Sequence, residues 1–455
     1  MKFRSMIAVV ALLLAATAPA QTSASRASLS DPALDALVAE ALANAPEISA
    51  ARSISIAARH RIVPAATLPD PFISTTYQND GRSLSLGKAE GSFLGLMVSQ
   101  TIPWPGKLSL AGRVAESEAK EIERGAVGRS ELAIEARVRN AWYDLLLARA
   151  IDGIIDDRHA AAAQIEATTR ARYAAGLGVQ QDVLRAQIEL ARLDELKATQ
   201  QATIAARTAE INRLVGSPQD RAIDTPATLP SEATLASAST LIAAAAQRSP
   251  EIASAAQALE SGRLRVDLAR RNFLPDFTVN GGSMYRGSFA MGPMWQVGVG
   301  VSVPLWIDRR QQNQLAEAKA LADARTADQS AVALELELRT RERIAQLQAA
   351  LRIARTYRES ILPLDELSLE SALASYQSAK LPFISVLDAL NTLYGDRATL
   401  MSRLAEAAKW RVAIDEASLQ PTAMSATAAM SSGSASAQTS APATAASGGS
   451  STSMR

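Results

Sequence analysis

Few residues of this 455-residue sequence have the types and spacing that chemistry requires. There is no cysteine and the only histidines are His60 and His159, which leaves little for thiolate metal sites or imidazole catalysis. The Gly106-Lys107 pair is not a phosphate loop, because Thr101 stands where an earlier glycine is needed and Leu108 follows the lysine. The sequence also lacks a Gly-x-Ser-x-Gly elbow and a His-Glu-x-x-His pair. We therefore expect no catalytic site, no enzyme activity and no cofactor.

Three methionines are the one weak metal candidate. Met284, Met291 and Met294 lie within eleven residues of each other, and thioether sulfur can bind soft ions such as Cu(I). Methionine is also a common apolar filler, so packing or lipid contact is the more ordinary interpretation. No other metal site is expected.

The charge balance argues against a nucleic-acid partner. Lys and Arg total 47 against 46 Asp and Glu, which leaves a formal net charge of +1. Such a chain has no global positive field that would attract polyphosphate, and its 4% aromatic content is low for base stacking.

The elements that position these residues occur twice. Four short segments recur in the same order at shifts of 201 to 206 residues, so a unit of about two hundred residues is duplicated. The first repeat is predicted over residues 21–230 and the second over 231–419. The matching segments are Ala45–Ile48 with Ser249–Ile252, Leu68–Phe72 with Leu274–Phe277, Thr101–Trp104 with Ser302–Leu305, and Tyr173–Leu184 with Tyr376–Leu387.

Each repeat is expected to begin with a short helix and two strands. Proline opens the helix at Pro46 or Pro250, where its missing N–H costs nothing. Apolar residues then alternate with polar or small ones, most clearly from Trp295 to Val303, which is typical of a strand with two different faces. The strands are predicted near residues 72–78 and 93–102, and near 277–285 and 295–303.

Long helical hairpins follow, over about residues 105–215 and 305–415. Apolar residues recur with a 4-3-4-3 spacing, as in Ile134, Val138, Ala141 and Leu145, which indicates coiled-coil packing. Each hairpin turns at a compact tip. The tip residues are Gly176, Leu177 and Gly178 in the first repeat, and Lys380, Leu381 and Pro382 in the second.

Both ends of the sequence are expected to lie outside the fold. Residues 1–20 have a cationic start, an apolar run of about twelve residues and a small-x-small site, as in a secretory signal peptide. Without cysteine, no lipid can be attached beside that site. Residues 420–455 are rich in Ser, Ala, Thr and Gly and are predicted to be disordered.

The strands have the length of membrane strands. Tilted β-strands of about 9–11 residues cross a bilayer, whereas a small soluble sheet packed on the helices is the alternative. Four strands cannot close a barrel, and an open edge in lipid leaves backbone groups unpaired. A membrane-embedded form must therefore oligomerise, with the polar strand face lining a pore and the valine face meeting lipid.

The sequence resembles the TolC-like outer-membrane efflux family over about residues 31–419. The resemblance rests on the repeated Leu-Pro-Asp stretch, on Ile102–Leu108 and on Ser385–Tyr394. It implies a mainly α fold with membrane β-strands, assembled as a homotrimer with one twelve-stranded barrel in outer-membrane lipid and a helical barrel across the periplasm.

The resemblance also implies a function and partners. Family members dock through a periplasmic adaptor onto an inner-membrane pump of the RND type and act as a passive exit duct. The segment from Pro103 to Lys107 is most similar to the branch that serves heavy-metal cation pumps. Many members of that branch are lipoproteins, and this chain departs from them because it has no cysteine. The expected substrates are metal cations or drugs.

If the protein is such a duct, four residues are candidates for its gate. Asp388 would form a ring of three carboxylates in a trimer, and such rings favour cations and repel one another. Many family members have a second aspartate three positions earlier, where this chain has Ser385. The first repeat has Asp182 and Arg185 at the equivalent positions, so Arg185 is a candidate partner for Asp388. Ordinary exposed helix charges are the alternative interpretation.

Two rival functions come from other classes. A periplasmic coiled-coil adaptor would be soluble and would lack barrel strands. A secreted hydrolase would need a convergent acid, base or nucleophile, which the motifs above do not provide.

Overall fold

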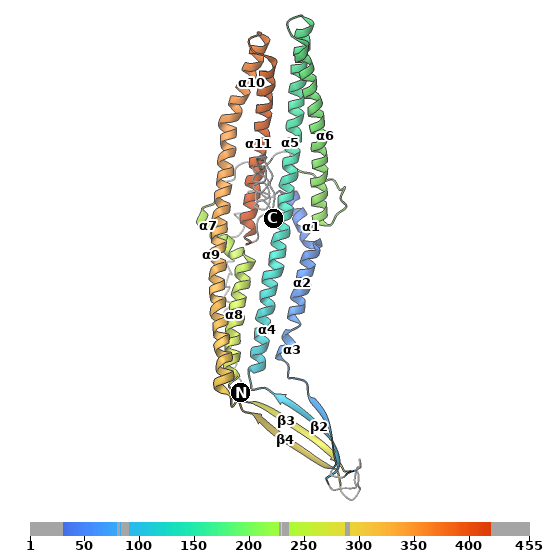
Figure 1. Ribbon diagram of the computed structural model, residues 1–455, viewed down its shortest axis with the longest axis vertical. Helices are drawn as coiled ribbons and strands as arrows, with labels where there is room; N and C mark the ends of the chain where they lie inside the picture. Colours follow the sequence, from blue (N-terminus) through green and yellow to red (C-terminus); the bar gives the residue numbers. More distant parts are fainter. Residues whose placement is uncertain are drawn as a thin grey trace, which may run out of the picture.

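The computed structural model describes residues 31–79, 82, 91–226, 229, 236–286 and 292–419. The predicted signal peptide, the predicted disordered tail and Met291 lie outside the described residues. The molecule is elongated, with a small sheet at one end and the tips of two helical hairpins at the other (Figure 1).

The two repeats have the same order of elements. Short helices lead into two strands, and the strands lead into a long helical hairpin. The first repeat contains α1 (Pro32–Asn44), α2 (Pro46–Arg59), α3 (Ile62–Ala66), β1 (Phe72–Gln78), β2 (Phe93–Ile102), α4 (Lys107–Ile122), η1 (Glu123–Val127), α5 (Gly128–Ala174) and α6 (Gln180–Val215). The second contains α7 (Ala238–Arg248), α8 (Pro250–Arg271), β3 (Asp276–Tyr285), β4 (Met294–Ser302), η2 (Ile307–Gln311), α9 (Gln312–Thr356), η3 (Tyr357–Ile361), α10 (Leu362–Gln377) and α11 (Phe383–Glu416).

The four strands form one antiparallel sheet in the order β1-β2-β3-β4. Because side chains alternate along a strand, this register gives the sheet an apolar and a polar face. The apolar face includes Val98 of β2 and Val297 and Val299 of β4, and the last two are each 69% exposed. The opposite face carries Ser99, Asn280 and several glycines. The second strand pair therefore follows the predicted alternation.

The long helices are less uniform than the sequence predicts. The outgoing helix of each hairpin contains π-helical turns, at η1 in the first repeat and at η2 and η3 in the second, whereas the returning helices α6 and α11 are continuous. At η1, Gly125 lies so close to α8 that a Cβ would be 2.7 Å from Ser254 Oγ. At η3, Pro363 follows, and its ring clashes with a regular helical turn before it.

Three apolar cores hold the described helices together, and the smallest joins α7, α9 and α11. The largest core joins α1, α5, α6 and α11 and includes the fully buried Trp142, Leu145 and Ile211. A second core lies towards the tips and joins α5, α6, α10 and α11, with Leu193, Phe383 and Leu390 at its centre. This second core packs the two hairpins against each other within a single chain.

Candidate functional site

The two hairpin tips have the same backbone turn. At the first tip, Leu177 N donates to Arg172 O at 2.9 Å and Gly176 N donates to Tyr173 O at 3.0 Å. At the second tip, Lys380 N donates to Ser375 O at 2.9 Å and Ala379 N donates to Tyr376 O at 3.0 Å. This hydrogen-bond pattern ends a helix on one left-handed residue. That residue is Gly176 in one repeat and Ala379 in the other, with φ of 71° and 60°.

Tyr376 connects the two tips. Its hydroxyl donates to Asp182 Oδ2 at 3.3 Å, and its ring lies 4.8 Å from the guanidinium carbon of Arg172. Arg172 also donates to the Gln377 carbonyl of the second hairpin. Tyr376 is buried, and burial raises the pKa of its phenol, so the hydroxyl stays protonated and can donate. Two residues of α5 and α6 therefore hold one residue of α10.

The four gate candidates are not all brought together in one chain. Asp182 contacts Tyr376. Asp388, in contrast, is exposed on α11, and its backbone carbonyl accepts a hydrogen bond from Thr392 Oγ1 at 2.8 Å. Within the described part of one chain, Arg185 and Asp388 form no ion pair with each other. Ser385 lies in the first turn of α11, where its N–H donates to Pro382 O at 3.1 Å.

The turn residues themselves are accessible. Leu177 is 69% exposed and Leu381 is 42% exposed, and Gly176, Lys380 and Pro382 are also exposed, while Gly178 is half-buried. Figure 1 shows both turns at the same end of the molecule, opposite the sheet. Each tip therefore presents an apolar side chain on a surface that no other described part of the chain covers.

A polar network below the tips was missed by the sequence analysis. Arg158 of α5 donates to Glu189 of α6 and, at 2.7 Å, to Asn391 Oδ1 of α11. Tyr394 Oη donates to the Asp157 carbonyl at 3.2 Å. Asn391 and Tyr394 belong to the Ser385–Tyr394 segment that carries the resemblance, so that motif was the available signal. The network ties α11 to the first hairpin.

The other resemblance motifs meet where the strands join the helices. Lys107 is buried, and its Nζ donates to Asp276 Oδ1 and to the Leu274 carbonyl, both at 2.8 Å. Asp276 also accepts from Trp104 N at 2.8 Å, and Trp104 stacks on Phe277 with ring centroids 5.6 Å apart. The Pro-Trp-Pro-Gly-Lys segment of one repeat and the Leu-Pro-Asp segment of the other therefore form one junction.

The methionine candidates lie on the sheet. Met284 of β3 pairs directly with Met294 of β4, and both lie on the polar face. Met291 falls in the stretch between the strands that the structure does not describe. Among the described residues, no group of three or more His, Cys, Asp or Glu is placed to hold a metal ion.

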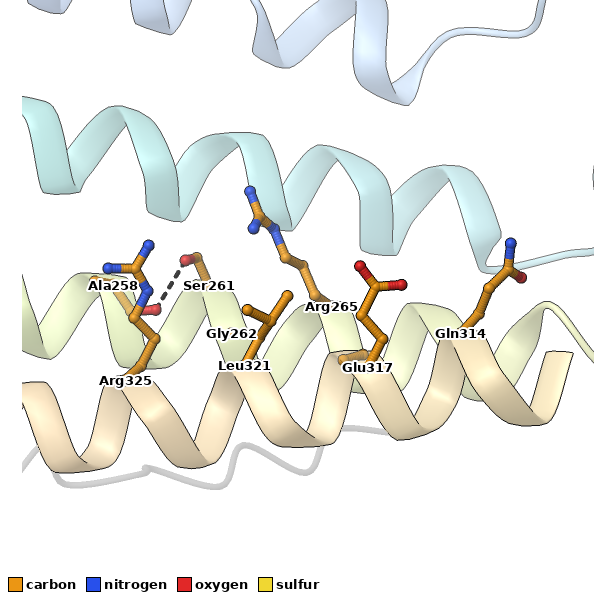
Figure 2. Close-up of a pocket in the computed structure, with 9 residues that line it drawn as sticks. Ala258, Ser261, Gly262, Arg265, Gln314, Glu317, Leu321 and Arg325 are labelled. Carbon is orange, nitrogen blue, oxygen red and sulfur yellow. Dashed lines mark hydrogen bonds between the residues drawn. The ribbon is translucent and has the colours of Figure 1, made fainter. Parts of the chain in front are cut away.

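One groove of about 210 Å³ opens between α8 and α9. Figure 2 shows Glu317, Leu321 and Arg325 of α9 along this groove, while Arg265 of α8 extends towards α4, where it donates to Glu118. The segment lies between the sheet and the tips in Figure 1, so the groove belongs to neither candidate site. Over the same described stretches, none of the helices is both long and apolar enough to cross a membrane.

The fold is that of outer-membrane channel proteins. The model of the outer membrane efflux protein family matches residues 37–216 and 241–418, and the chain belongs to this family. The two matched stretches correspond to the two repeats, so the predicted tandem-repeat fold is confirmed. The protein is therefore an efflux protein of the outer membrane.

Similar proteins agree with this assignment. The cobalt-zinc-cadmium resistance protein CzcC of Cupriavidus metallidurans is 23% identical over 359 residues, which cover 78% of this chain and 82% of CzcC. The outer-membrane channel OprN has a TM-score of 0.69 at 20% identity, covering 85% of this chain and 90% of its own. VceC of Vibrio cholerae has the same TM-score and identity, with 85% and 96% covered. CusC has a TM-score of 0.66 at 17% identity, with 86% and 94% covered.

Proposed function

We propose that this protein is the passive outer-membrane duct of a tripartite efflux system. The observation that carries the proposal is the four-stranded sheet, which has one apolar face and leaves the outer edges of β1 and β4 without a partner strand among the described residues. Unpaired backbone groups are not tolerated in lipid. Three copies would give twelve strands, join every edge to a neighbour and close a barrel.

In that assembly the apolar sheet face meets outer-membrane lipid and the polar face lines the pore. The apolar side chains on the lipid side are highly exposed in the single chain, at 69–79% for Trp295, Val297 and Val299. Such exposure is expected for side chains that contact lipid in the assembled channel. The hairpins continue the pore across the periplasm. The chain supplies no energy source, so transport is driven by an inner-membrane pump.

The tips are the proposed docking points for a periplasmic adaptor that links the duct to an RND-type pump. Exposed Leu177 and Leu381 give each tip a small apolar contact, and the rigid turns that carry them hold the contact in place. Exposed apolar side chains rimmed by polar residues favour a protein partner at this end.

The same end is the proposed gate. Tyr376, Asp182 and Arg172 hold the two hairpins together in one chain, and three Asp388 carboxylates would surround the axis of a trimer. Like charges at close distance repel, so a closed state needs a counter-charge, and Arg185 of the other hairpin is our candidate.

The proposed substrates are metal cations. The support is the similarity to CzcC, a cobalt-zinc-cadmium resistance protein, and the resemblance of the segment from Pro103 to Lys107 to the branch that serves heavy-metal cation pumps. Deletion of the gene should sensitise cells to copper, silver, zinc, cobalt or cadmium salts more than to dyes and antibiotics. Plasmid-borne wild type should restore growth, whereas a variant that fails to assemble should not. Sensitivity to drugs without sensitivity to metals would reject metal export and leave a drug duct.

A further inference from the structure

Three methionines share one small area of the sheet. The register places Met97 of β2 opposite Gly282 of β3, and Met284 of β3 opposite Met294 of β4. All three therefore lie on the polar face. Met284 is the direct cross-strand neighbour of Met294, with Cβ atoms about 5 Å apart, and a diagonal neighbour of Met97, at about 7–8 Å, within the reach of methionine side chains. Met97 and Met294 lie on β2 and β4, on either side of Met284. Met97 comes from the first repeat, so the grouping was not visible in the sequence.

Glycines keep this area open. Gly95 lies beside Met284 in the register, and Gly282 lies between Met97 and Gln296. Gly282 cannot be replaced by a larger residue, because a Cβ there would be 2.5 Å from the Leu96 carbonyl oxygen. Across this gap Gln296 Nε2 approaches Met97 Sδ at 3.9 Å. The Met97 thioether therefore points over the sheet surface towards β4.

We propose that Met97, Met284 and Met294 form a weak binding site for soft monovalent cations, namely Cu(I) and Ag(I). Thioether sulfur is a neutral, soft ligand that prefers these ions to Zn(II) or Co(II), which favour imidazole, carboxylate or thiolate. A neutral site binds without releasing protons and holds the ion loosely. Loose binding suits a pore wall, where an ion must enter and also leave.

The guanidinium of Arg286 should weaken the binding of a metal ion at this site. Arg286, the residue after the end of β3, contacts the Met294 sulfur. A metal ion at Met294 must displace this guanidinium, which lowers the affinity of the site. Replacement of Arg286 by glutamine should therefore tighten silver binding, which a purely structural role for the methionines would not predict.

The physiological meaning of the site rests on the proposed function, because a duct wall meets metal ions only if metals are exported. Binding itself does not depend on transport. The test is isothermal titration of silver nitrate into the full-length channel in detergent, in chloride-free and thiol-free buffer. Its background has Met291, Met424, Met430 and Met454 changed to leucine. Met1 and Met6 belong to the predicted signal peptide, which is absent from the processed channel that is titrated, so no thioether outside the described residues remains.

In this background we expect each chain to bind one silver ion. The additional triple change Met97→Leu, Met284→Leu and Met294→Leu should abolish this binding. Met401→Leu on α11 is the matched control and should leave binding unchanged. Leucine nearly conserves volume, and an unchanged oligomer mass and circular dichroism spectrum verify folding. Unchanged silver binding in the triple variant, or none in the background, would overturn the site.

The two proposals fail in different ways. Silver binding that depends on the three methionines, in cells whose gene deletion causes no metal sensitivity, would keep the site and reject metal export. Metal sensitivity on deletion, together with a triple variant that binds silver as well as the background does, would keep export and reject the site. Competition by excess zinc nitrate should not displace silver, and displacement would overturn the stated preference for soft ions.

Discussion

Tyr376 and its partners make the first test at the scale of single residues. Tyr376→Phe removes the hydrogen bond to Asp182 and keeps the ring beneath Arg172. A hydrogen bond of this kind contributes about 1 kcal/mol, which is about a fivefold change in an equilibrium constant. If the bond holds the tip closed, the resting conductance of the channel in planar bilayers should rise by about that factor.

The first repeat supplies the control. Tyr173 is the counterpart of Tyr376, but it is exposed, so Tyr173→Phe should leave the conductance unchanged. Asp182→Ala removes the acceptor of the same hydrogen bond and should act like Tyr376→Phe. The double variant should be no more open than the single ones, because both changes remove one bond. A Tyr376→Phe channel with wild-type resting current would show that the bond does not take part in closure.

Ala379 is strained in the native turn. It takes the left-handed conformation that its counterpart Gly176 adopts freely, and a residue with a Cβ loses about 1–2 kcal/mol there. Glycine also gains entropy in the unfolded chain, so Ala379→Gly should stabilise the second hairpin by only about 0.5–1 kcal/mol. Gly176→Ala should destabilise the first. Thermal midpoints of the purified channel measure both, and equal shifts in one direction would contradict the turn geometry.

At this scale the sequence predicted positions better than contacts. Both tips were located from the glycine and proline residues that interrupt the helical pattern, since turns need special backbone angles. Asp182 was selected as a gate candidate, but its contact with Tyr376 depends on how two hairpins pack, which no local pattern determines. Arg172 and Arg158 were missed because single arginines on long helices resemble ordinary surface charges.

At the scale of elements, the sheet can be tested by two neighbouring residues of β2. Val98 lies on the apolar face and Ser99 on the polar face. Arginine facing lipid at the middle of the membrane costs about 2–4 kcal/mol, whereas a pore-facing arginine meets water. Val98→Arg should therefore reduce the amount of folded channel in outer-membrane fractions, and Ser99→Arg should be tolerated. Equal tolerance of both would place the sheet outside the membrane.

The pairing of α10 with α11 should depend on pH. Burial and the neighbouring Asp396 carboxylate raise the pKa of Asp365 above its ordinary value of 3.8. An acid with a raised pKa in the folded state stabilises that state fully below its unfolded pKa, and this contribution is lost as the pH rises through the folded pKa. The thermal midpoint should therefore fall as the pH rises from that range to neutral.

Asp365→Asn should remove this part of the pH dependence and raise the midpoint at neutral pH. Glu370→Gln, a change to an exposed carboxylate on the same helix, serves as the control and should leave the profile as it is. Identical profiles for wild type and Asp365→Asn would show that the Asp365–Asp396 contact does not control the stability of this helix pair.

The elements themselves were largely predictable. The second strand pair follows a clean alternation, and β3 and β4 lie within one residue of the expected ends. The π-helical turns were not predicted. The turn at Gly125 lies where α8 of the other repeat approaches closely, and this long-range contact leaves no local pattern in the sequence. The bond from Lys107 to Asp276 was likewise hidden, although both residues lie in motifs that the sequence analysis singled out.

At the scale of the whole molecule, the single chain is incomplete. Its sheet has two unpartnered edges in the described structure and its apolar strand face is exposed. In the proposed trimer its two hairpins would form only part of the wall of the duct. These features are costly in one chain and are relieved together by closed symmetry. The properties that matter for transport, such as pore width and charge on the axis, arise only in that assembly.

A trimeric assembly would bring the Asp388 side chains together in a ring around its axis. Asp388 is exposed in one chain. In a trimer the three Asp388 carboxylates, one from each protomer, would therefore face the axis or a neighbouring tip rather than a buried partner. A ring of carboxylates attracts cations, so Asp388→Asn should lower the cation preference measured from reversal potentials in a salt gradient. Arg185→Ala should raise the resting conductance if it neutralises the ring of Asp388 in the closed state.

An interacting pair should not be additive, so the double variant should resemble the more severe single one. Glu195→Gln changes an exposed carboxylate on α6 and should alter neither selectivity nor resting current. Should Asp388→Asn and Arg185→Ala both conduct like the wild type, these residues are ordinary surface charges. The constriction would then depend on Tyr376, Asp182 and Arg172, which already join the hairpins inside each chain.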